Sequence, residues 1–454
     1  MTEAPTVDRP SAAPGELRTR GHERAVANVR TMIAGRVPHA ILISGPSGIG
    51  KTTLALDLAA GLLCDDVDPH ARPCRACRGC RLVERGRHPD VHRLAPTGPG
   101  DQIRIGTRDR PEDGTVRRLA SDLVLLPVEG GARVAIIERA DRLTDDAQTA
   151  LLKTLEEPPA GVTIVLCADD EDRLLPTVRS RAARIRLGPV ATREIEAILA
   201  ETGAAEPPIA ARLARIAGGR PGAAQVLARA PEAVAARDEI ARILLDLLST
   251  TAAPRLAAVR DLTARATELT RALDRVAHET DGVDDPVAGS PKRGRAKTKA
   301  GAAGGAASMA SAGATRTPGA GTAPGDGADP DAADAEADEP GGGRTAVPAA
   351  ERRRAAAIVV GLWRELARDL LVVILGQERQ VRDPALLDDL REAAARLAAG
   401  APDRDGDAGM ADGGEALGGF LARLDAAGEL LEANVRPELV LDTLVLRWPA
   451  VARR

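Results

Sequence analysis

Residues 40–63 read AILISGPSGIGKTTLALDLAAGLL: an apolar run, a glycine-rich turn and a stretch with helical periodicity. The turn fits the pattern G-x-x-x-x-G-K-[ST], and it follows a predicted strand and opens a predicted helix, the context that this pattern requires. Glycines let backbone N–H groups approach phosphates closely, and a helix N-terminus adds positive potential. The sequence therefore predicts a phosphate-binding loop made of Gly45, Pro46, Ser47, Gly48, Ile49, Gly50, Lys51 and Thr52. Lys51 would reach the β- and γ-phosphates and Thr52 would ligate Mg²⁺; the alternative is a strand-to-helix turn without a ligand.

Short apolar runs alternate with helical stretches from this loop as far as Leu187. We predict strands at 40–43, 91–94, 134–137, 162–167 and 185–187. Strands that alternate with helices indicate an α/β domain with a mainly parallel sheet. After Pro189 the strand signal ends and only helical patterns remain.

The domain organisation follows from these shifts in pattern. We expect a disordered N-terminus at 1–15, an α/β domain at 16–188, a small helical domain at 189–245, and a second helical domain at 246–454 that a disordered linker interrupts at 281–348. The linker is dominated by Gly, Ala, Ser, Pro and Asp, so it cannot bury enough surface to offset its ordering entropy. The alternative for its basic first part is a weak electrostatic contact with DNA.

Composition excludes several classes of protein. The net charge of the 454 residues is −4, so no global basic field attracts nucleic acid. The chain has no Tyr, one Phe and two Trp, whereas modules that bind single strands stack bases on aromatic rings. The polar N-terminus does not resemble a signal peptide, and no apolar run is long enough to span a membrane. We therefore expect a cytoplasmic protein whose five cysteines are not paired in disulfides.

The end of the strand at 134–137 carries the second half of a nucleotide site. A P-loop ATPase needs an acidic residue there to hold Mg²⁺ and usually a neighbouring carboxylate to activate water. Glu138 can take the first role, but Arg139 stands at the second position and cannot act as a general base. Since losing a base costs about 10²–10⁴ in rate, we expect nucleotide binding with poor or absent hydrolysis. The alternative is that Glu138 and Arg139 form only a charge pair at the end of a strand.

Four of the five cysteines fall in one segment with the spacing C-x9-C-x2-C-x2-C: Cys64, Cys74, Cys77 and Cys80. Thiolates at this spacing reach one tetrahedral ion, and four thiolates suit Zn²⁺. A site filled by four protein ligands is structural. The alternatives are a set of reduced, exposed thiols and an iron–sulfur cluster, which the small, highly charged loop disfavours. His70 and His88 are spare nitrogen donors that we interpret as solvated, and we interpret Cys167 as a small core residue.

Further along, an arginine-rich turn precedes the last predicted strand, in Leu175-Pro-Thr-Val-Arg-Ser-Arg181. An arginine exposed there could reach the nucleotide site of a neighbouring subunit, an effect worth about 10³–10⁵ in rate in such enzymes. Taken by itself, this arginine is better explained as a solvated surface residue.

Together these segments resemble the clamp-loader branch of the AAA+ proteins, most closely the delta-prime subunits of bacterial DNA polymerase III. The resemblance is carried by the cysteine segment, by His88-Pro-Asp-Val-His92, by Leu151-Leu-Lys-Thr-Leu-Glu-Glu-Pro-Pro159 and by Leu174-Leu-Pro-Thr-Val-Arg-Ser-Arg181. It is strong over residues 21–187 and weaker over the helical remainder, where Leu431-Glu-Ala-Asn-Val-Arg-Pro-Glu-Leu439 looks like the end of the collar domain of the family.

The resemblance implies a AAA+ domain, a helical lid and a helical collar that assembles a five-subunit ring with gamma/tau and delta subunits. It implies DNA replication as the process, with the sliding clamp and primer-template DNA met through the ring, as part of a DNA-directed DNA polymerase. It implies a Ser-Arg-Cys motif whose arginine serves the ATP of a neighbouring motor subunit. This motif maps onto Ser180 and Arg181, with Ala182 replacing the cysteine. The zinc ligands of the family map onto the four cysteines.

Two alternatives to a scaffolding subunit remain at this point. The first is an active motor ATPase of the gamma/tau type, against which Arg139 argues. The second is an unrelated P-loop protein whose zinc module binds nucleic acid, against which the low aromatic content and near-neutral charge argue.

Overall fold

The computed structural model describes residues 15–96, 101–107, 112–129, 131–281, 348–399, 406–433 and 435–449. We predict disorder at 1–15 and in the linker at 281–348. Apart from residues 15, 281 and 348, these segments lie outside the described ranges. Within the described ranges, no helix combines the length and the apolar content that a membrane crossing requires.

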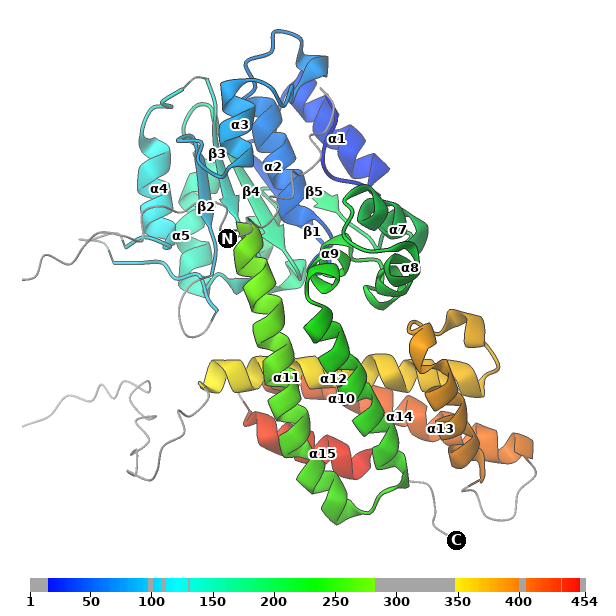
Figure 1. Ribbon diagram of the computed structural model, residues 1–454. Coiled ribbons are helices and arrows are strands. Elements are labelled where there is room, and N and C mark those ends of the chain that lie inside the picture. Colours follow the sequence, from blue (N-terminus) through cyan, green and yellow to red (C-terminus); the bar gives the residue numbers. More distant parts are fainter. Residues whose placement is uncertain are drawn as a thin grey trace, which may run out of the picture. The chain divides into compact units, whose positions relative to one another are not determined.

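Five parallel strands form the sheet of the first domain, as the alternating pattern predicts (Figure 1). They are β1 (Ala40–Ser44), β2 (Val91–Leu94), β3 (Arg133–Ile137), β4 (Val162–Ala168) and β5 (Ala183–Arg186), in the spatial order β2-β3-β4-β1-β5. β1 lies between β4 and β5, with Ile41 opposite both Val165 and Ala183. The α/β fold class is therefore confirmed.

Alternate side chains of the central strands enter two separate cores, because successive residues of a strand face opposite sides of a sheet. On one face, Ile41 and Ile43 pack with α1 (Glu23–Ala34), α2 (Lys51–Leu62) and α3 (Arg78–Glu84). On the other, Ala40 and Leu42 pack with α4 (Val116–Val124), α5 (Asp145–Glu156) and the single turn α6 (Pro176–Arg179). Figure 1 shows the first set of helices and the second set on opposite sides of the sheet.

A small group of helices extends the first of these cores. It consists of α7 (Thr192–Glu201), α8 (Pro207–Ile216) and α9 (Pro221–Arg229). Ile195, Leu199 and Leu213 of this group join the core that contains α1 and α2.

The remaining helices surround a third core. They are α10 (Pro231–Asp246), α11 (Ala252–Asp281), α12 (Ala349–Ile374), α13 (Leu387–Ala399), α14 (Gly406–Glu432) and α15 (Pro437–Arg447). Because most buried residues of α10, such as Ile240 and Leu244, lie in this core, α10 packs mainly with the later helices, although its residue Val234 packs against the core of α7–α9. The short 3₁₀ helices of the chain are η1 (Pro69–Ala71), η2 (Ala140–Arg142), η3 (Glu171–Arg173), η4 (Leu247–Ser249), η5 (Glu378–Gln380) and η6 (Pro384–Leu386).

All three aromatic residues of the chain meet in this last core. The ring of Phe420 lies 5.3 Å from that of Trp363 and 4.8 Å from that of Trp448, and the two indoles are 5.5 Å apart. All three side chains are buried, so none offers a ring on which a base could stack.

Candidate functional site

The predicted phosphate loop connects β1 to α2 at the carboxyl edge of the sheet (Figure 1). Its glycines adopt positive φ angles of 151° at Gly45, 76° at Gly48 and 109° at Gly50, a region that side chains other than glycine rarely enter. At Gly45 a Cβ atom would lie 2.4 Å from the carbonyl oxygen of Leu187, so the loop can pass β5 only with glycine there. Lys51 and Thr52 open α2, where the helix N-terminus favours an anion.

Lys51 makes three contacts within the chain. Its Nζ atom donates to the carbonyl oxygens of Gly45, at 2.6 Å, and Pro46, at 2.9 Å. It also lies 2.6 Å from Oδ1 of Asp169, which follows β4. These partners match the three donors of a lysine ammonium group.

The phosphate loop also touches segments on either side of it. The backbone N–H of Gly222, at the start of α9, donates to the carbonyl oxygen of Gly48 at 2.9 Å. A ring nitrogen of the buried His22 lies 3.0 Å from the carbonyl oxygen of Ile49. The loop is therefore held by the α7–α9 group and by the segment that precedes α1.

The residues after β3 stand beside the loop across the sheet, because β4 alone separates β3 from β1. Glu138 accepts a hydrogen bond from Nε of Arg93 on β2 at 2.7 Å. Arg139 has a left-handed backbone, with φ 51°, and Nη1 lies 2.6 Å from Oδ2 of Asp101. The position where a water-activating carboxylate is expected thus holds an arginine with a carboxylate partner of its own.

Asp141, three residues after Glu138, is buried and makes a structural hydrogen bond. Its Oδ1 accepts the backbone N–H of Asp169 at 2.8 Å, and the residue is only 8% exposed. Asp141 therefore fixes the end of β4 next to the phosphate loop.

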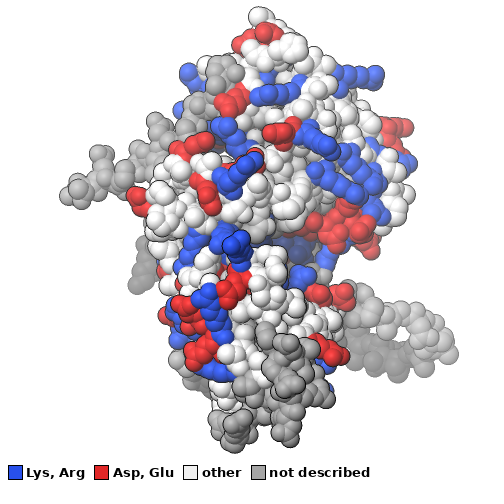
Figure 2. Space-filling model, turned by 90° about the vertical axis from the view of Figure 1, so that its right-hand side faces the viewer, with Lys and Arg blue, Asp and Glu red and all other residues white. Residues whose placement is uncertain are grey.

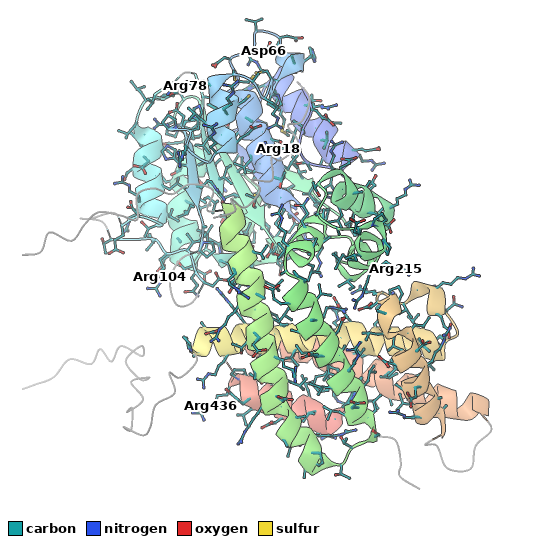
Figure 3. The ribbon with its side chains drawn as sticks, in the orientation of Figure 1. Arg18, Asp66, Arg78, Arg104, Arg215 and Arg436 are labelled. Carbon is teal, nitrogen blue, oxygen red and sulfur yellow. The ribbon has the colours of Figure 1, made fainter. Side chains whose placement is uncertain are left out.

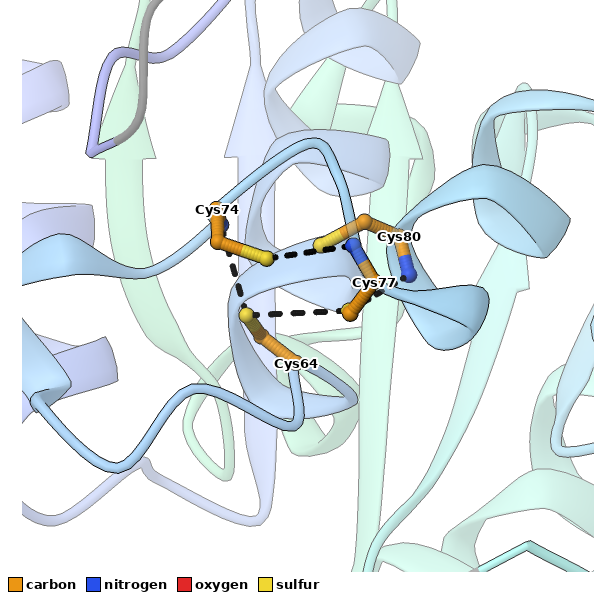
Figure 4. A group of neighbouring side chains, drawn as sticks. All are labelled: Cys64, Cys74, Cys77 and Cys80. Carbon is orange, nitrogen blue, oxygen red and sulfur yellow. Dashed lines mark hydrogen bonds between the residues drawn. The ribbon is translucent and has the colours of Figure 1, made fainter.

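The four cysteines of the second predicted site converge at the end of α2 and the start of α3 (Figure 4). Their sulfur atoms lie within 4.8 Å of one another, and those of Cys64 and Cys77 are 4.0 Å apart. A tetrahedral zinc ion with Zn–S bonds near 2.3 Å requires sulfurs about 3.8 Å apart, so the cluster could hold a metal ion with a small contraction. Arg78, labelled in Figure 3, opens α3 beside the cluster and pairs with Glu129.

Backbone N–H groups point at the sulfurs, as a thiolate cluster requires. The N–H groups of Cys74, Cys77 and Cys80 donate to the sulfurs of Cys64, Cys74 and Cys77, each at 3.3 Å. Burial raises the pKa of the Cys64 and Cys80 thiols. At Cys74 burial also raises the pKa, but backbone hydrogen bonds from Ala76 and Cys77 outweigh it and lower the pKa to about 7. The donor set therefore fits a closed structural metal site with no open position for chemistry.

The histidines differ in part from the sequence-based interpretation. His88 is buried rather than solvated, since Nδ1 accepts the backbone N–H of Asp90 at 3.1 Å and Nε2 lies 4.0 Å from Glu129. It helps to position the chain that enters β2. Cys167 is a buried strand residue, as expected.

A buried ion pair ties the cysteine module to α2, and sequence reasoning missed it. Nη2 of Arg75 lies 2.6 Å from Oδ1 of Asp57, and both side chains are almost inaccessible, at 3% and 1% exposed. Oδ2 of Asp57 accepts the N–H of Thr19 at 2.9 Å and its hydroxyl at 2.8 Å. The signal that could have found the pair is a single carboxylate inside the apolar run Leu54–Leu63.

Arg181 follows α6 and is partly exposed, at 36%. Its Nη2 pairs with Oε1 of Glu156 at 2.5 Å, and its Nη1 donates to the carbonyl oxygen of Thr177 at 3.0 Å. Arg179, two residues earlier, pairs with Asp172. The structure thus places Arg181 at a surface, held by one exposed carboxylate.

Charges of both signs are interspersed on the molecular face shown in Figure 2. In this view several basic side chains gather in the upper part of the molecule, and a group of acidic side chains lies below them. The net charge of the full chain is −4.

The known proteins to which this chain is similar include several subunits of DNA polymerase III. Residues 21–191 match the family model described as DNA polymerase III, delta subunit. The chain is 36% identical over 206 residues to the delta' subunit of DNA polymerase III from Escherichia coli (strain K12), which covers 45% of this chain and 58% of that protein. It is 36% identical over 183 residues to the tau subunit of Salmonella typhimurium, covering 39% of this chain and 27% of that protein.

The chain spans about half the length of the curated delta' relatives it matches. Among solved structures it is similar to a gamma-subunit-related protein of DNA polymerase III from Thermotoga maritima, with a TM-score of 0.37 and 15% identity, covering 94% of this chain and 99% of that one.

Proposed function

Because residues 21–191 match a family model of DNA polymerase III and the chain is 36% identical over 206 residues to a delta' subunit, we propose that this chain is a scaffolding subunit of the DNA polymerase III clamp loader, an AAA+ assembly. In this function it joins gamma/tau and delta subunits in a five-membered ring. It meets the sliding clamp and primer-template DNA through that ring. It donates Arg181 to the ATP site of a neighbouring motor subunit.

The observation that best supports the scaffolding role is the position of Arg139 and its ion pair with Asp101. The arginine takes the position of the water-activating carboxylate and is itself paired with Asp101. A fixed positive charge there cannot accept a proton from water. The loop around Lys51 is intact, so the proposal is a subunit that binds ATP·Mg²⁺, with Glu138 on the metal side, and hydrolyses it poorly or not at all.

The surroundings of Arg181 support its action on a neighbour. Its ion pair with Glu156 is half-exposed on the carboxylate side, and exposed pairs contribute about 0–1 kcal/mol. Moving the guanidinium to a phosphate would therefore cost little, and a planar guanidinium suits phosphate oxygens.

The metal proposed for Cys64, Cys74, Cys77 and Cys80 is Zn²⁺ in a structural role. For the domains, we propose a AAA+ domain at 16–188, a lid and a collar. We place the end of the lid near Arg229 instead of 245, since α10 packs into the core of the later helices.

Reconstitution of the ring tests the proposal. The chain is mixed with gamma/tau, delta, clamp and primed DNA, and assembly and ATP turnover are measured. We expect Arg181→Ala to assemble normally and to reduce turnover at least tenfold, whereas Arg184→Ala, an exposed neighbour on β5, leaves turnover unchanged. Failure of the wild-type chain to enter the ring would refute the scaffolding role. Normal turnover with Arg181→Ala would refute only the role of Arg181 at the ATP site of the neighbouring subunit.

The second candidate is a motor ATPase of the gamma/tau type. The intact phosphate loop and the similarity to tau favour it. Turnover by the isolated chain, beside Lys51→Ala, separates the two: turnover that disappears with Lys51→Ala means a motor, and no turnover in either chain supports the scaffold.

A further inference from the structure

Asp169 holds the phosphate-loop lysine in a contact that no phosphate-binding role requires. Its Oδ1 lies 2.6 Å from Nζ of Lys51, and the lysine side chain is 7% exposed. The two other partners of Nζ are neutral carbonyl oxygens of the loop. Asp169 therefore supplies the one anionic partner that the structure gives to this ammonium group.

Hydrogen bonds hold the backbone that carries this carboxylate. The backbone N–H of Asp169 donates to Oδ1 of the buried Asp141. One residue earlier, the carbonyl oxygen of Ala168 accepts the N–H of Gly45 at 3.2 Å, which ties the end of β4 to the first residue of the loop. The side chain of Asp169 therefore starts from a fixed backbone next to Lys51.

A bound polyphosphate would need the same ammonium group. Since Lys51 has three donors and three partners, a phosphate oxygen can reach it only by displacing one of them. A polyphosphate near Lys51 also brings negative charge to within a few ångströms of the Asp169 carboxylate. At that distance like charges repel strongly in a partly buried site.

We propose that Asp169 is an internal competitor for Lys51 that weakens the binding of nucleoside polyphosphates and favours the nucleotide-free state of this chain. The inference rests on the proposed nucleotide site and adds how its affinity is set. It concerns the terminal phosphates, because Lys51 is the residue that reaches them, and it leaves binding of the base and sugar unchanged.

Titration of the full chain with ATP and with AMP tests this. We expect Asp169→Asn to tighten ATP binding about tenfold or more and AMP binding less than about twofold. The matched control is Asp170→Asn, which removes the same charge one residue away on an exposed side chain whose Oδ1 caps η3. In a Lys51→Ala background, Asp169→Asn should no longer change ATP affinity.

The outcomes separate the inference from the proposed function. If the wild-type chain binds ATP and Asp169→Asn binds it no more tightly, or more weakly, the competition is refuted and the nucleotide site remains supported. The same holds if Asp169→Asn still raises the affinity for ATP in the Lys51→Ala background. Absence of ATP binding in every variant overturns both. An unfolding cycle of Lys51→Met and Asp169→Asn checks the pair without nucleotide: coupling of about tenfold in the unfolding constant supports the ion pair, and additivity refutes it.

Discussion

Replacing Asp57 with asparagine tests whether the cysteine module and α2 unfold as one unit. Asp57 is 1% exposed on α2, and its two oxygens accept from Arg75 and from the N–H and hydroxyl of Thr19. Asparagine keeps the size of the side chain but removes its charge. It also turns one acceptor into a donor, which then faces either the guanidinium or the Thr19 donors.

The size of the effect follows from what Arg75 retains. Breaking a buried ion pair by neutralising one partner typically costs about 3–5 kcal/mol, because the other charge stays buried. Nη1 of Arg75 keeps Glu84 at 3.3 Å, and its Nη2 keeps the carbonyl oxygen of Glu16 at 3.2 Å. These contacts favour the lower end, so we expect a loss of about 3 kcal/mol in the free energy of unfolding.

Urea unfolding followed by circular dichroism measures this loss, and a chromogenic chelator reports metal release in the same samples. We expect metal release and unfolding of Asp57→Asn to move together to lower urea concentration. The control is Asp65→Asn, an exposed carboxylate next to Cys64, which should cost less than about 0.5 kcal/mol. A loss below about 1 kcal/mol for Asp57→Asn, or metal release that stays at the wild-type urea concentration, would refute the reasoning.

Three further predictions concern other parts of the chain. Burial raises the pKa of Asp90, but hydrogen bonds from Glu129 and Val128 and the Arg133 guanidinium outweigh it and lower the pKa. The contribution of Asp90 to stability is therefore present above its unfolded pKa of ~4 and is lost as pH falls through the lower folded pKa. Asp90→Asn should be less stable at pH 7 and should lose less stability below pH ~4 in acid titrations; a curve parallel to that of the wild type contradicts this. Phe420→Ala opens a cavity between two buried indoles and should cost about 3–5 kcal/mol in urea unfolding, whereas Phe420→Leu should cost less than half as much. Removing the metal with a chelator should lower the melting temperature, because metal binding and folding are coupled; an unchanged melting temperature after verified removal argues against a structural metal, and Cys167→Ala, which lies outside the cluster, should keep its metal content.

Most helices and strands could be predicted from local sequence patterns. The helix α5 begins directly after Thr144, whose hydroxyl accepts the N–H of Ala147, and ends before Pro158, so its bounds follow from residues close in the chain. All five predicted strands are present, with shifts of one or two residues at their ends. Such elements are predictable because periodicity, caps and proline stops act between residues close in the chain.

The contacts that sequence reasoning missed connect residues far apart. Asp57 and Arg75 are 18 residues apart, and Lys51 and Asp169 are 118 apart. No spacing rule links such pairs, since strand order and the path of a loop decide whether they meet. The boundary predicted at 245 differs from the one proposed near Arg229 for a similar reason: α10 has the periodicity of any amphipathic helix, and the core that most of its buried residues join depends on packing.

The charged groups at the carboxyl edge of the sheet agree with the proposal that this chain acts on a neighbouring subunit rather than on a nucleotide of its own. Lys51 is paired with Asp169, Glu138 with Arg93, and Arg139 with Asp101. These internal contacts would compete with contacts to a nucleotide or its metal ion. Catalysis gains most from groups that are already aimed at the transition state, and these groups are aimed at one another. Arg181 differs, because its carboxylate partner is at the surface and screened by water. In the proposed function, the charged groups beside the phosphate loop are thus held by internal partners, whereas Arg181 would leave its exposed carboxylate partner at little cost.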